Sequence, residues 1–390
     1  MALSREENEM LTRVGPGTAG GEMLRRYWHP IAFASELKQK PVRRRILGED
    51  LVLFRDEQGR VGLLALRCSH RGTSLEFGHL ENGGLRCCYH GWLYDVQGRV
   101  LETPGEPADS TFGARVRHPA YKIQELAGIL FAYLGPEPAP LLPRYDVLVR
   151  EDGVRSMSAR TVHCNFLQMV ENSVDQHHFK WLHRTPKTRQ WKEEKLTSDI
   201  TDFGILDTFT RRVGDEYFRT ISLFLMPNMN KVGYHLPEDH PAAFAATHEG
   251  YEALRWRVPV DDVTTMHFTL YFAPLVDGKV TAKMPKDQQD QGLGDSIPGK
   301  YRWDEETGWI ARGDQDRCAQ ESQGEILDRT AEHLAVSDEG VILLRRLFKQ
   351  AIDAVRKGED PVGVIRDPAK NQILRLVPGE YKVDPSELSE

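Results

Sequence analysis

The sequence predicts an α+β protein in which a small antiparallel β domain precedes a longer region that mixes helices and strands. Short alternating apolar runs, separated by turn residues, recur between Val42 and Gly135, and this pattern is typical of antiparallel strands. The segment Gly135–Pro143 carries four prolines, as a linker would. Beyond Leu148, helical spacing and strand-like runs are mixed, and the 390 residues are enough for two or three domains.

The segment from Ser4 to Tyr27 is expected to form two short helical pieces broken by a Gly/Pro turn. Its glycines 15, 17 and 20 match G-x-G-x-x-G, but the match follows a polar helical stretch and contains Pro16. A loop is therefore favoured over a nucleotide site. The strands expected next are Arg44–Leu47, Leu51–Arg55, Val61–Leu66, Leu85–Cys88, Trp92–Asp95 and Ile129–Leu134.

In the second region, Asn165–His183 has helical spacing. Glu325–Lys357 is expected to form one or two helices, with an apolar face made by Val341, Leu344, Leu347 and Phe348. The polar stretch Leu275–Gly308 is punctuated by Gly and Pro and is expected to be a mobile loop or lid. The strands expected between the helices are Ile221–Met226, Arg255–Val260 and Met266–Phe272.

Composition excludes several classes of protein. Lys and Arg number 51 and Asp and Glu 58, a net charge of −7 without a basic block, which disfavours a general nucleic-acid or anionic-membrane binder. No apolar run is long enough to span a membrane, and residues 1–10 lack the apolar stretch of a secretory signal. The five cysteines are sparse and odd in number, so we expect a reducing, cytoplasmic location rather than a disulfide scaffold.

Two Cys–His pairs form the first constellation. Cys68 and His70 lie in R-C-S-H-R-G-T, and Cys87 and His90 lie in R-C-C-Y-H-G-W, so the spacing is C-x-H, sixteen residues, then C-x2-H. Two thiolates suit one iron of a [2Fe–2S] cluster and two neutral imidazoles suit the other, which is Rieske ligation. A zinc site would accept the same ligands, but classical fingers group the two cysteines and the two histidines separately. The pattern therefore favours the Rieske cluster.

Two neighbouring residues compete with these ligands. Cys88 is adjacent to Cys87, but only Cys87 gives C-x2-H with His90. The first loop has no second cysteine to pair with Cys88, so we expect Cys88 to be a buried free thiol. His79 lies between the two loops, and a structural or surface role is favoured for it.

The second constellation is E-N-S-V-D-Q-H-H-F-K-W-L-H at residues 171–183. Two histidines with a carboxylate suggest the 2-His-1-carboxylate triad of non-haem Fe(II) sites. His178 and His183 are five residues apart, about 140° around a regular helix, so they would not share a face. The segment must then be distorted, or the site must lie at a helix end. His177 is an alternative to His178.

Together the two constellations resemble the catalytic subunit of Rieske non-haem iron ring-hydroxylating oxygenases. The family motif D-x2-H-x4-H falls on Asp175, His178 and His183. The resemblance implies that both histidines bind iron and that Asp175 is a bridging acid between His178 and the cluster ligand His90 of the neighbouring subunit. Further stretches, among them L-R-R-Y-W-H-P, C-N-F-L-Q and W-R-V-P-V-D-D, resemble the branch that contains phthalate 4,5-dioxygenase and phenoxybenzoate dioxygenase.

The family has a third iron ligand, a carboxylate far downstream of the histidines. The stretch from Gln320 to Leu347 resembles the corresponding part of that branch, and Asp338 is the residue we expect to bind iron. Glu339 and Asp328 are the alternatives. Taken without the resemblance, Asp338 would be interpreted as a helix cap or first-turn acid.

The resemblance also implies architecture and partners. It predicts N-terminal helices (1–26) that pack on the catalytic domain, a Rieske domain (27–140), and an iron domain (141–390) with a large antiparallel sheet flanked by helices. One [2Fe–2S] cluster and one mononuclear Fe(II) are expected per chain. The subunits are expected to form a head-to-tail homotrimer, and a separate flavin/iron–sulfur reductase, with or without a ferredoxin, is expected to supply electrons from NADH.

The activity so implied is that of a terminal oxygenase component, which uses O2 to hydroxylate a small aromatic substrate, an aryl carboxylate or an aryl ether. Dihydroxylation, ether cleavage and monooxygenation with O-demethylation all remain open. Arg255 or Arg257 could hold a substrate carboxylate, although a surface ion pair is the default interpretation. A non-catalytic Rieske electron carrier is the alternative of a different class, but it would need only the β domain.

Overall fold

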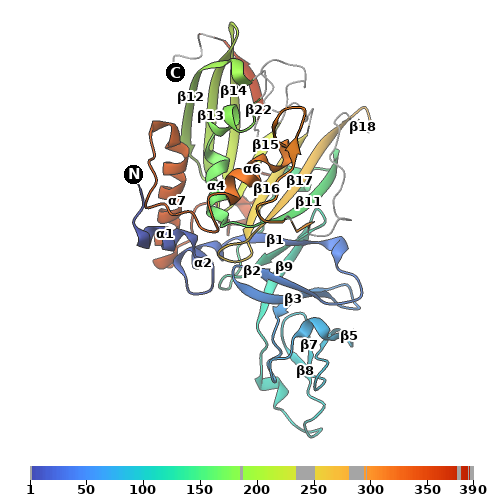
Figure 1. Ribbon diagram of the computed structural model, residues 1–390. Coiled ribbons are helices and arrows are strands. Elements are labelled where there is room, and N and C mark those ends of the chain that lie inside the picture. The colour runs from blue at the N-terminus through green and yellow to red at the C-terminus, as the bar shows by residue number, and fades with distance from the viewer. Residues whose placement is uncertain are drawn as a thin grey trace.

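The computed structural model describes residues 2–184, 188–233, 251–280, 294–295, 297–375, 379–384 and 386. Figure 1 shows a broad twisted sheet with helices along one side, and a smaller β unit below it that ends in a protruding tip. The expected α+β class is confirmed. Within the described residues, no helix combines the length and the apolar character that crossing a membrane requires.

The smaller unit contains, in its described residues, a six-stranded and a four-stranded antiparallel sheet. The six-stranded sheet has the order β1-β10-β9-β4-β3-β2, and the four-stranded sheet follows the chain from β5 to β8. The first is made of β1 (Trp28–Phe33), β2 (Val42–Ile46), β3 (Glu49–Arg55), β4 (Val61–Ala65), β9 (Ala120–Leu126) and β10 (Ile129–Tyr133). The second, at the protruding tip, is made of β5 (His79–Glu81), β6 (Gly84–Arg86), β7 (Leu93–Tyr94) and β8 (Val100–Glu102).

The larger unit is built on a sheet of ten strands, counted over the described residues, with the order β12-β13-β14-β15-β16-β17-β11-β19 and with β18 and β22 beside it. The pairing is antiparallel except between β11 and β19. Its long strands are β11 (Gly153–Val162), β12 (Trp191–Ile200), β13 (Gly204–Val213), β14 (Glu216–Leu225), β15 (Met229–Gly233), β16 (Glu252–Pro259) and β17 (Thr265–Val276). Its short strands are β18 (Lys279–Val280), β19 (Gly294–Asp295) and β22 (Gly379–Val383). A separate hairpin pairs β20 (Trp303–Asp304) with β21 (Trp309–Ile310).

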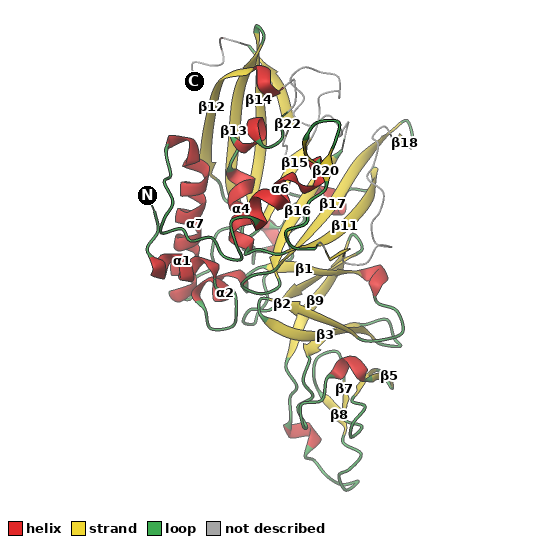
Figure 2. Ribbon diagram, viewed as in Figure 1, coloured by secondary structure: helices red, strands yellow, loops and turns green. Residues whose placement is uncertain are grey.

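The helices gather on the side of this sheet that Figure 2 shows in front. They are α1 (Arg5–Thr12), α2 (Ala19–Leu24), α4 (Phe166–Val174), α5 (His178–Trp181), α6 (Arg312–Glu321) and α7 (Glu339–Arg356), with the short α3 (Asp146–Val149) at the start of the larger unit. The two N-terminal helices are those expected from the sequence, and both contact α7. Ser4 caps α1 through a capping box with Glu7, which satisfies backbone donors at the helix start.

One hydrophobic core joins the two units. Phe33 of β1 packs edge-on against Phe268 of β17, with ring centroids 5.8 Å apart. Phe131 of β10 packs against Trp256 of β16 at 6.0 Å. Both pairs are buried, so the smaller unit is fixed to the sheet by apolar burial, the dominant favourable term in folding.

The C-terminal helix confirms one expectation and corrects another. Its predicted apolar face is buried, with Leu344 and Phe348 fully inaccessible. The helix begins only at Glu339, and residues 325–335 are not helical. Polar groups of this segment bond to the start of α4 and to α4 itself instead of to one another. The Glu325 carbonyl accepts from the Asn165 N–H, and Arg329 forms a buried ion pair with Glu171 of α4. The expected loop Leu275–Gly308 lies partly outside the described residues.

Helix α7 starts in very close contact with the end of α4. A Cβ on Gly340 would lie 2.3 Å from the Val174 carbonyl oxygen, far inside contact distance. We expect Gly340→Ala to destabilise the fold by about 1–3 kcal/mol, since backbone on both sides must move. Thermal unfolding should show a lowered midpoint. Gly105→Ala is the matched control, because its Cβ would meet nothing within 4 Å, and an equal loss in both variants would contradict the argument.

Candidate metal centres

The two Cys–His loops of the smaller unit have the same pattern of backbone hydrogen bonds. In the first, the Cys68 N–H donates to the Thr73 carbonyl and the Gly72 N–H donates back to the Cys68 carbonyl. In the second, the Cys87 N–H donates to the Trp92 carbonyl and the Gly91 N–H donates back to the Cys87 carbonyl. Gly72 and Gly91 have φ of 75° and 73°, a left-handed conformation that favours glycine. The matched turns hold the two cysteines in equivalent positions, whereas His70 follows its cysteine by two residues and His90 by three.

The side chains of these loops fit a Rieske cluster. Cys68 and Cys87 are buried, His70 is exposed and His90 is half-buried. The two imidazole rings lie 4.6 Å apart, and His70 stacks on Trp92 at 4.8 Å. Burial raises the pKa of the Cys87 thiol, with a further rise from the adjacent Cys68. The two thiols thus lie together and buried, and the two imidazoles lie together nearer the surface, an arrangement that suits a [2Fe–2S] cluster held by two cysteines and two histidines.

Two residues near the predicted ligands, Cys88 and His79, are not among those ligands. Cys88 is a free thiol, as expected, but it lies in the turn after β6 and is exposed rather than buried. His79 lies on β5 with its side chain exposed, in agreement with a surface role.

In the larger unit, a helix break brings the two predicted iron-binding histidines together. Helix α4 ends at Val174, Asp175 is extended (φ −94°, ψ 106°), and α5 starts at His178. The rings of His178 and His183 are 5.3 Å apart. The distortion that the five-residue spacing required is therefore present, and it lies at a helix end.

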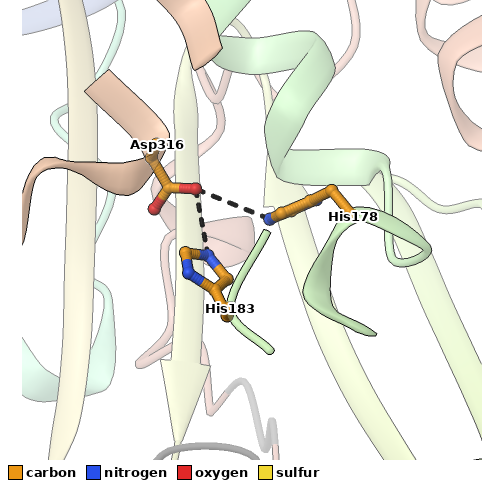
Figure 3. Close-up of side chains that lie close together, drawn as sticks. All are labelled: His178, His183 and Asp316. Carbon is orange, nitrogen blue, oxygen red and sulfur yellow. Dashed lines mark ion pairs between the residues drawn. The ribbon is translucent and has the colours of Figure 1, made fainter. Parts of the chain in front are cut away.

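The carboxylate beside these histidines is Asp316, not Asp338. The ligand atoms of His178, His183 and Asp316 all lie within 4.8 Å of one another. Asp316 Oδ1 is 3.0 Å from His183 Nε2 and 3.6 Å from His178 Nε2. Figure 3 shows Asp316 pointing from α6 towards both rings. Among the described residues this group contains neither His177 nor the other carboxylates considered from the sequence, Asp328 and Glu339.

The expectation for Asp338 is corrected by its place in the fold. Asp338 is the residue before α7, and its carboxylate accepts a hydrogen bond from the Ala335 N–H at 2.7 Å. Asp338 therefore closes the 3-10 turn η6 (Val336–Asp338), where it is a first-turn acid, and its side chain makes no cap hydrogen bond to α7 itself. Asp316 lies upstream of the stretch from Gln320 to Leu347 that resembles the family, and nothing in R-G-D-Q-D-R distinguishes Asp316 from Asp314 as a ligand.

The electrostatics of the triad suit a cation. Burial alone would raise the pKa of the Asp316 carboxyl, but His183, His178 and Arg160 together hold it well below its usual range. Burial lowers the pKa of His178, which favours the neutral form of the ring that coordinates a metal. Over the described part of the chain, Asp316 Oδ1 is buried without a hydrogen-bond partner. A buried carboxylate oxygen facing two imidazole nitrogens is the donor set of an Fe(II) facial triad.

Each histidine is oriented by a partner on its other nitrogen. His178 Nδ1 lies 2.5 Å from the Asp175 carbonyl oxygen, and His183 Nδ1 lies 2.7 Å from Gln315 Oε1. Both acceptors fix the tautomer in which Nε2 is the metal-binding atom. Gln315 is itself held by a bond from Nε2 to the Ile310 carbonyl at 2.9 Å. Sequence inspection did not identify Gln315.

Removing the acceptor on His183 should weaken metal binding. We expect Gln315→Leu to lower the affinity for Fe(II) about 10–100-fold, measured as the iron retained against a graded chelator, with no change in the cluster spectrum. Gln315→Glu keeps an acceptor and should restore most of the affinity. Gln323→Leu is the control on an exposed position of the same segment. Unchanged affinity in Gln315→Leu would show that this bond has no part in orienting His183.

Asp175 lies between the triad and the surface. Its Oδ1 accepts from the His177 N–H at 2.9 Å, and its Oδ2 is 3.8 Å from His178 Nδ1. A third of its side chain is exposed. The carboxylate can therefore contact the His178 ring on one side and an outside group on the other.

A cavity of about 590 Å³ opens next to the triad, within the range of small-molecule sites. It is lined by all three triad residues and, on strands β11, β16 and β17, by Arg160, Arg255, Arg257 and His267. Trp256, between two of these arginines, points the opposite way into the core, as the alternation of a strand requires. Both arginines line the cavity, and Arg257 is buried, so the default interpretation as a surface residue is wrong for Arg257.

Comparisons with known proteins give one domain match and several relatives along nearly the whole chain. Residues 27–121 match the Rieske [2Fe-2S] domain family. The chain is 37% identical to the 5,5'-dehydrodivanillate O-demethylase oxygenase subunit of Sphingobium sp., over 96% of this chain and 86% of the relative. It is 35% identical to phenoxybenzoate dioxygenase subunit alpha of Ectopseudomonas oleovorans (95% and 90%) and 36% identical to the tert-butanol monooxygenase / tert-amyl alcohol desaturase oxygenase subunit of Aquincola tertiaricarbonis (94% and 81%).

A solved structure shares the fold. The oxygenase in the reduced oxygenase–ferredoxin complex of carbazole 1,9a-dioxygenase superposes with a TM-score of 0.61 at 18% identity, covering 92% of this chain and 98% of that one. The predicted family, enzyme class and cofactor set, a Rieske [2Fe–2S] cluster with mononuclear iron, are confirmed. By its Rieske domain and its near full-length similarity to oxygenase subunits, the chain belongs to the Rieske non-haem iron oxygenases and is an oxygenase component.

Proposed function

We propose that this oxygenase component acts on an aryl carboxylate, held with its carboxylate against the arginines of the cavity and its ring towards the iron. The observation that carries this proposal is the cationic wall beside the triad. The names of two relatives, a dehydrodivanillate demethylase and a phenoxybenzoate dioxygenase, refer to aromatic acids. A third is named for an uncharged alcohol, so family membership alone does not select an acid.

Arg257 is the strongest candidate for the carboxylate contact. Its side chain is buried, and its Nη1 donates to Asn230 Oδ1 and to the Arg255 carbonyl. Considering the described residues, its Nε is buried without a hydrogen-bond partner. An unused donor on a buried guanidinium is costly unless a ligand satisfies it, and a carboxylate is the anion whose geometry it matches.

The surroundings of Arg257 add to the positive potential. Burial, with Arg255 and Arg160 nearby, lowers the pKa of Arg257 to about 9, so the group is still charged at neutral pH. Burial also lowers the pKa of His267 well below its ordinary value, with the three arginines adding to the effect. His267 is therefore neutral, and its Nε2 is buried without a partner in the described part of the chain. A bound anion would relieve the mutual repulsion of these arginines.

We propose that His178, His183 and Asp316 hold the mononuclear iron, and that Cys68, His70, Cys87 and His90 hold the [2Fe–2S] cluster. A bound iron supplies the redox chemistry by which O2 is activated next to the substrate. The chain's own residues orient the two imidazoles, keep Asp316 ionised and fix the substrate's acid group away from the metal.

Electrons reach an oxygenase component from separate electron-transfer partners. We propose a flavin/iron–sulfur reductase using NADH, with or without a ferredoxin, and a head-to-tail homotrimer in which Asp175 bridges His178 to His90 of the neighbouring subunit. The exposure of Asp175 and His70 and the partial exposure of His90 support this arrangement. The division into residues 1–26, 27–140 and 141–390 and the cytoplasmic location stay proposals; the match over residues 27–121 and the five free thiols support them.

The test is a panel of matched acids and neutral analogues. Benzoates, phthalates, phenoxybenzoates and methoxybenzoates would each be compared with their methyl esters, using a surrogate reductase, under 18O2 with product masses recorded. We expect 18O-labelled products from acids and little or none from esters. Equal turnover of acids and esters would overturn the carboxylate assignment.

The same panel distinguishes O-demethylation from ring hydroxylation. The similarity to a demethylase oxygenase subunit favours testing this second activity. Loss of a methyl group from methoxybenzoates as formaldehyde, with one atom of each 18O2 entering the released one-carbon unit and the other reduced to water, would identify a demethylase. Two labelled oxygens in a ring product would identify a dioxygenase.

A further inference from the structure

His29 is a fully buried histidine of β1, in the stretch L-R-R-Y-W-H-P. It is neither a proposed metal ligand nor one of the described residues that line the cavity. Its Nε2 lies 2.8 Å from the carbonyl oxygen of Leu24, the last residue of α2, and its Nδ1 lies 3.4 Å from Asn228 Nδ2. The ring therefore connects the N-terminal helices to the larger unit.

The partners of His29 determine its tautomer. A carbonyl oxygen only accepts, so the ring proton is on Nε2. Burial, with the positive charge of Arg25, lowers the pKa of His29 to about 4, so the ring is neutral and its Nδ1 is an acceptor. The side-chain amide of Asn228 therefore donates one of its two hydrogens to His29.

The second amide hydrogen of Asn228 holds Arg257, the arginine proposed to bind the substrate carboxylate. Asn228 Nδ2 donates to the Arg257 carbonyl at 2.8 Å, and the Asn228 carbonyl accepts from the Arg257 N–H at 2.9 Å. Asn228 is buried and directly precedes β15, whose first residue, Met229, pairs with Trp256 of β16. The side chain of Asn228 thus completes the pairing of the two strands at Arg257.

Arg257 needs a fixed backbone because its surroundings repel it. Arg255 and Arg160 are close enough to disfavour its charge, and like charges push one another apart. The guanidinium is held by Asn230 through Nη1, and the backbone is held by Asn228. A contact with a small ligand requires its groups to be placed within about 0.5 Å, so a shift of this backbone would weaken the grip on a carboxylate.

We propose that His29 and Asn228 are positioning residues for substrate recognition, which hold Arg257 where it can bind the carboxylate of an aryl acid. The inference rests on the proposed contact between Arg257 and that carboxylate. His29 fixes the Asn228 amide from the side of the smaller unit, and Asn228 fixes Arg257 at both its N–H and its carbonyl. The end of α2 and strand β1 thereby contribute to substrate preference without contacting the substrate.

The test is the ratio of kcat/KM for an aryl acid to kcat/KM for its methyl ester. It is measured on the full chain with a surrogate reductase, using the acid of the substrate panel that is turned over fastest. We expect Asn228→Leu to lower this ratio about tenfold, through a higher KM for the acid with kcat nearly unchanged. In the Arg257→Leu background the same change should lower the ratio no further, because Asn228 acts through Arg257.

Two substitutions of His29 separate its two bonds. Glutamine places its amide near the position of Nε2 and keeps a donor for Leu24, whereas asparagine places its amide near Nδ1 and keeps an acceptor for Asn228. We expect His29→Gln to lower the ratio about threefold and His29→Asn to stay near wild type. Trp28→Phe is the control, because it removes a buried bond of β1 to the Pro140 carbonyl; it should lower the thermal midpoint and leave the ratio unchanged.

Two results would overturn the inference while leaving the substrate proposal in place. The first is an unchanged ratio in Asn228→Leu or in His29→Gln when Arg257→Leu lowers it. The second is an equal loss in His29→Gln and His29→Asn, because it would mean that His29 only anchors α2. Where Asn228→Leu fails to fold, His29→Gln decides, since it leaves both bonds between Asn228 and Arg257. An unchanged ratio in Arg257→Leu itself would contradict the substrate proposal and the inference with it.

Discussion

Replacing Asp316 by Ala should reduce the iron content from about three to about two per chain and abolish oxygenation, with the cluster spectrum unchanged. The reason is geometric. Asp316 Oδ1 is the carboxylate oxygen that faces both His178 and His183. Two imidazoles alone would hold Fe(II) weakly, and an uncompensated positive centre would remain in a buried site. Metal analysis with acid-labile sulfide, EPR of the cluster and product formation measure the three parts of this result.

Asp338→Ala is the matched control for this variant. It removes the acceptor for the Ala335 N–H in the 3-10 turn that precedes α7, and it should cost about 1 kcal/mol of stability while leaving iron and turnover in place. If Asp316 is the carboxylate ligand, only Asp316→Ala loses the mononuclear iron; if Asp338 is the ligand, only Asp338→Ala loses it. If Asp338→Ala lost the mononuclear iron and Asp316→Ala retained it, the ligand suggested by the sequence would be correct and the proposed triad would be wrong.

Replacing Arg257 by Leu should lower kcat/KM for an aryl carboxylate about 30-fold or more. This corresponds to the loss of at least about 2 kcal/mol expected when one partner of a buried, hydrogen-bonded charge pair is removed. Turnover of the corresponding neutral ester should not fall. The ratio of kcat/KM for the acid to kcat/KM for the ester should therefore decrease or fall below one. Arg257→Lys keeps a charge but not the planar fork, so it should retain part of the acid activity.

Controls separate recognition of the acid from damage to the fold. Arg302 also lines the cavity, but its side chain is 74% exposed and is paired with Asp314, so Arg302→Leu should change kcat/KM for the acid only slightly. Thermal unfolding reports whether Arg257→Leu disturbs the contact with Asn230. A loss that is equal for the acid and the ester would assign Arg257 a structural role and contradict the substrate proposal.

The cluster loops and the helix break could be predicted because their determinants are local. Each loop closes through hydrogen bonds within five residues, between Cys68 and Thr73 and between Cys87 and Trp92. The five-residue spacing of His178 and His183 is incompatible with one face of a regular helix, and the chain does break at Asp175. In the cluster loops and at the helix break, the residues that form the sequence motif also form the local backbone geometry.

The third ligand and the cavity wall could not be predicted in this way. Asp316 reaches His183 because α6 packs against α4, and 132 residues separate His183 from Gln315, the neighbour of Asp316 in the chain. An acid at a helix start, such as Asp338, looks the same in sequence whether it caps the helix or binds a metal. Strand alternation separates Trp256 from Arg255 and Arg257, but it does not tell which face of the sheet is core and which is cavity.

By itself, the sequence determined the α+β class, the ligands proposed for the cluster, the two histidines proposed for the iron site and membership of the oxygenase family. These features follow from residue types at short, fixed spacings. The tertiary structure alone decided the carboxylate beside the histidines, Gln315 behind His183, and the arginines that face the cavity. Those contacts arise from the packing of α6 and of three sheet strands around α4, and long-range packing leaves no pattern that can be read from neighbouring residues.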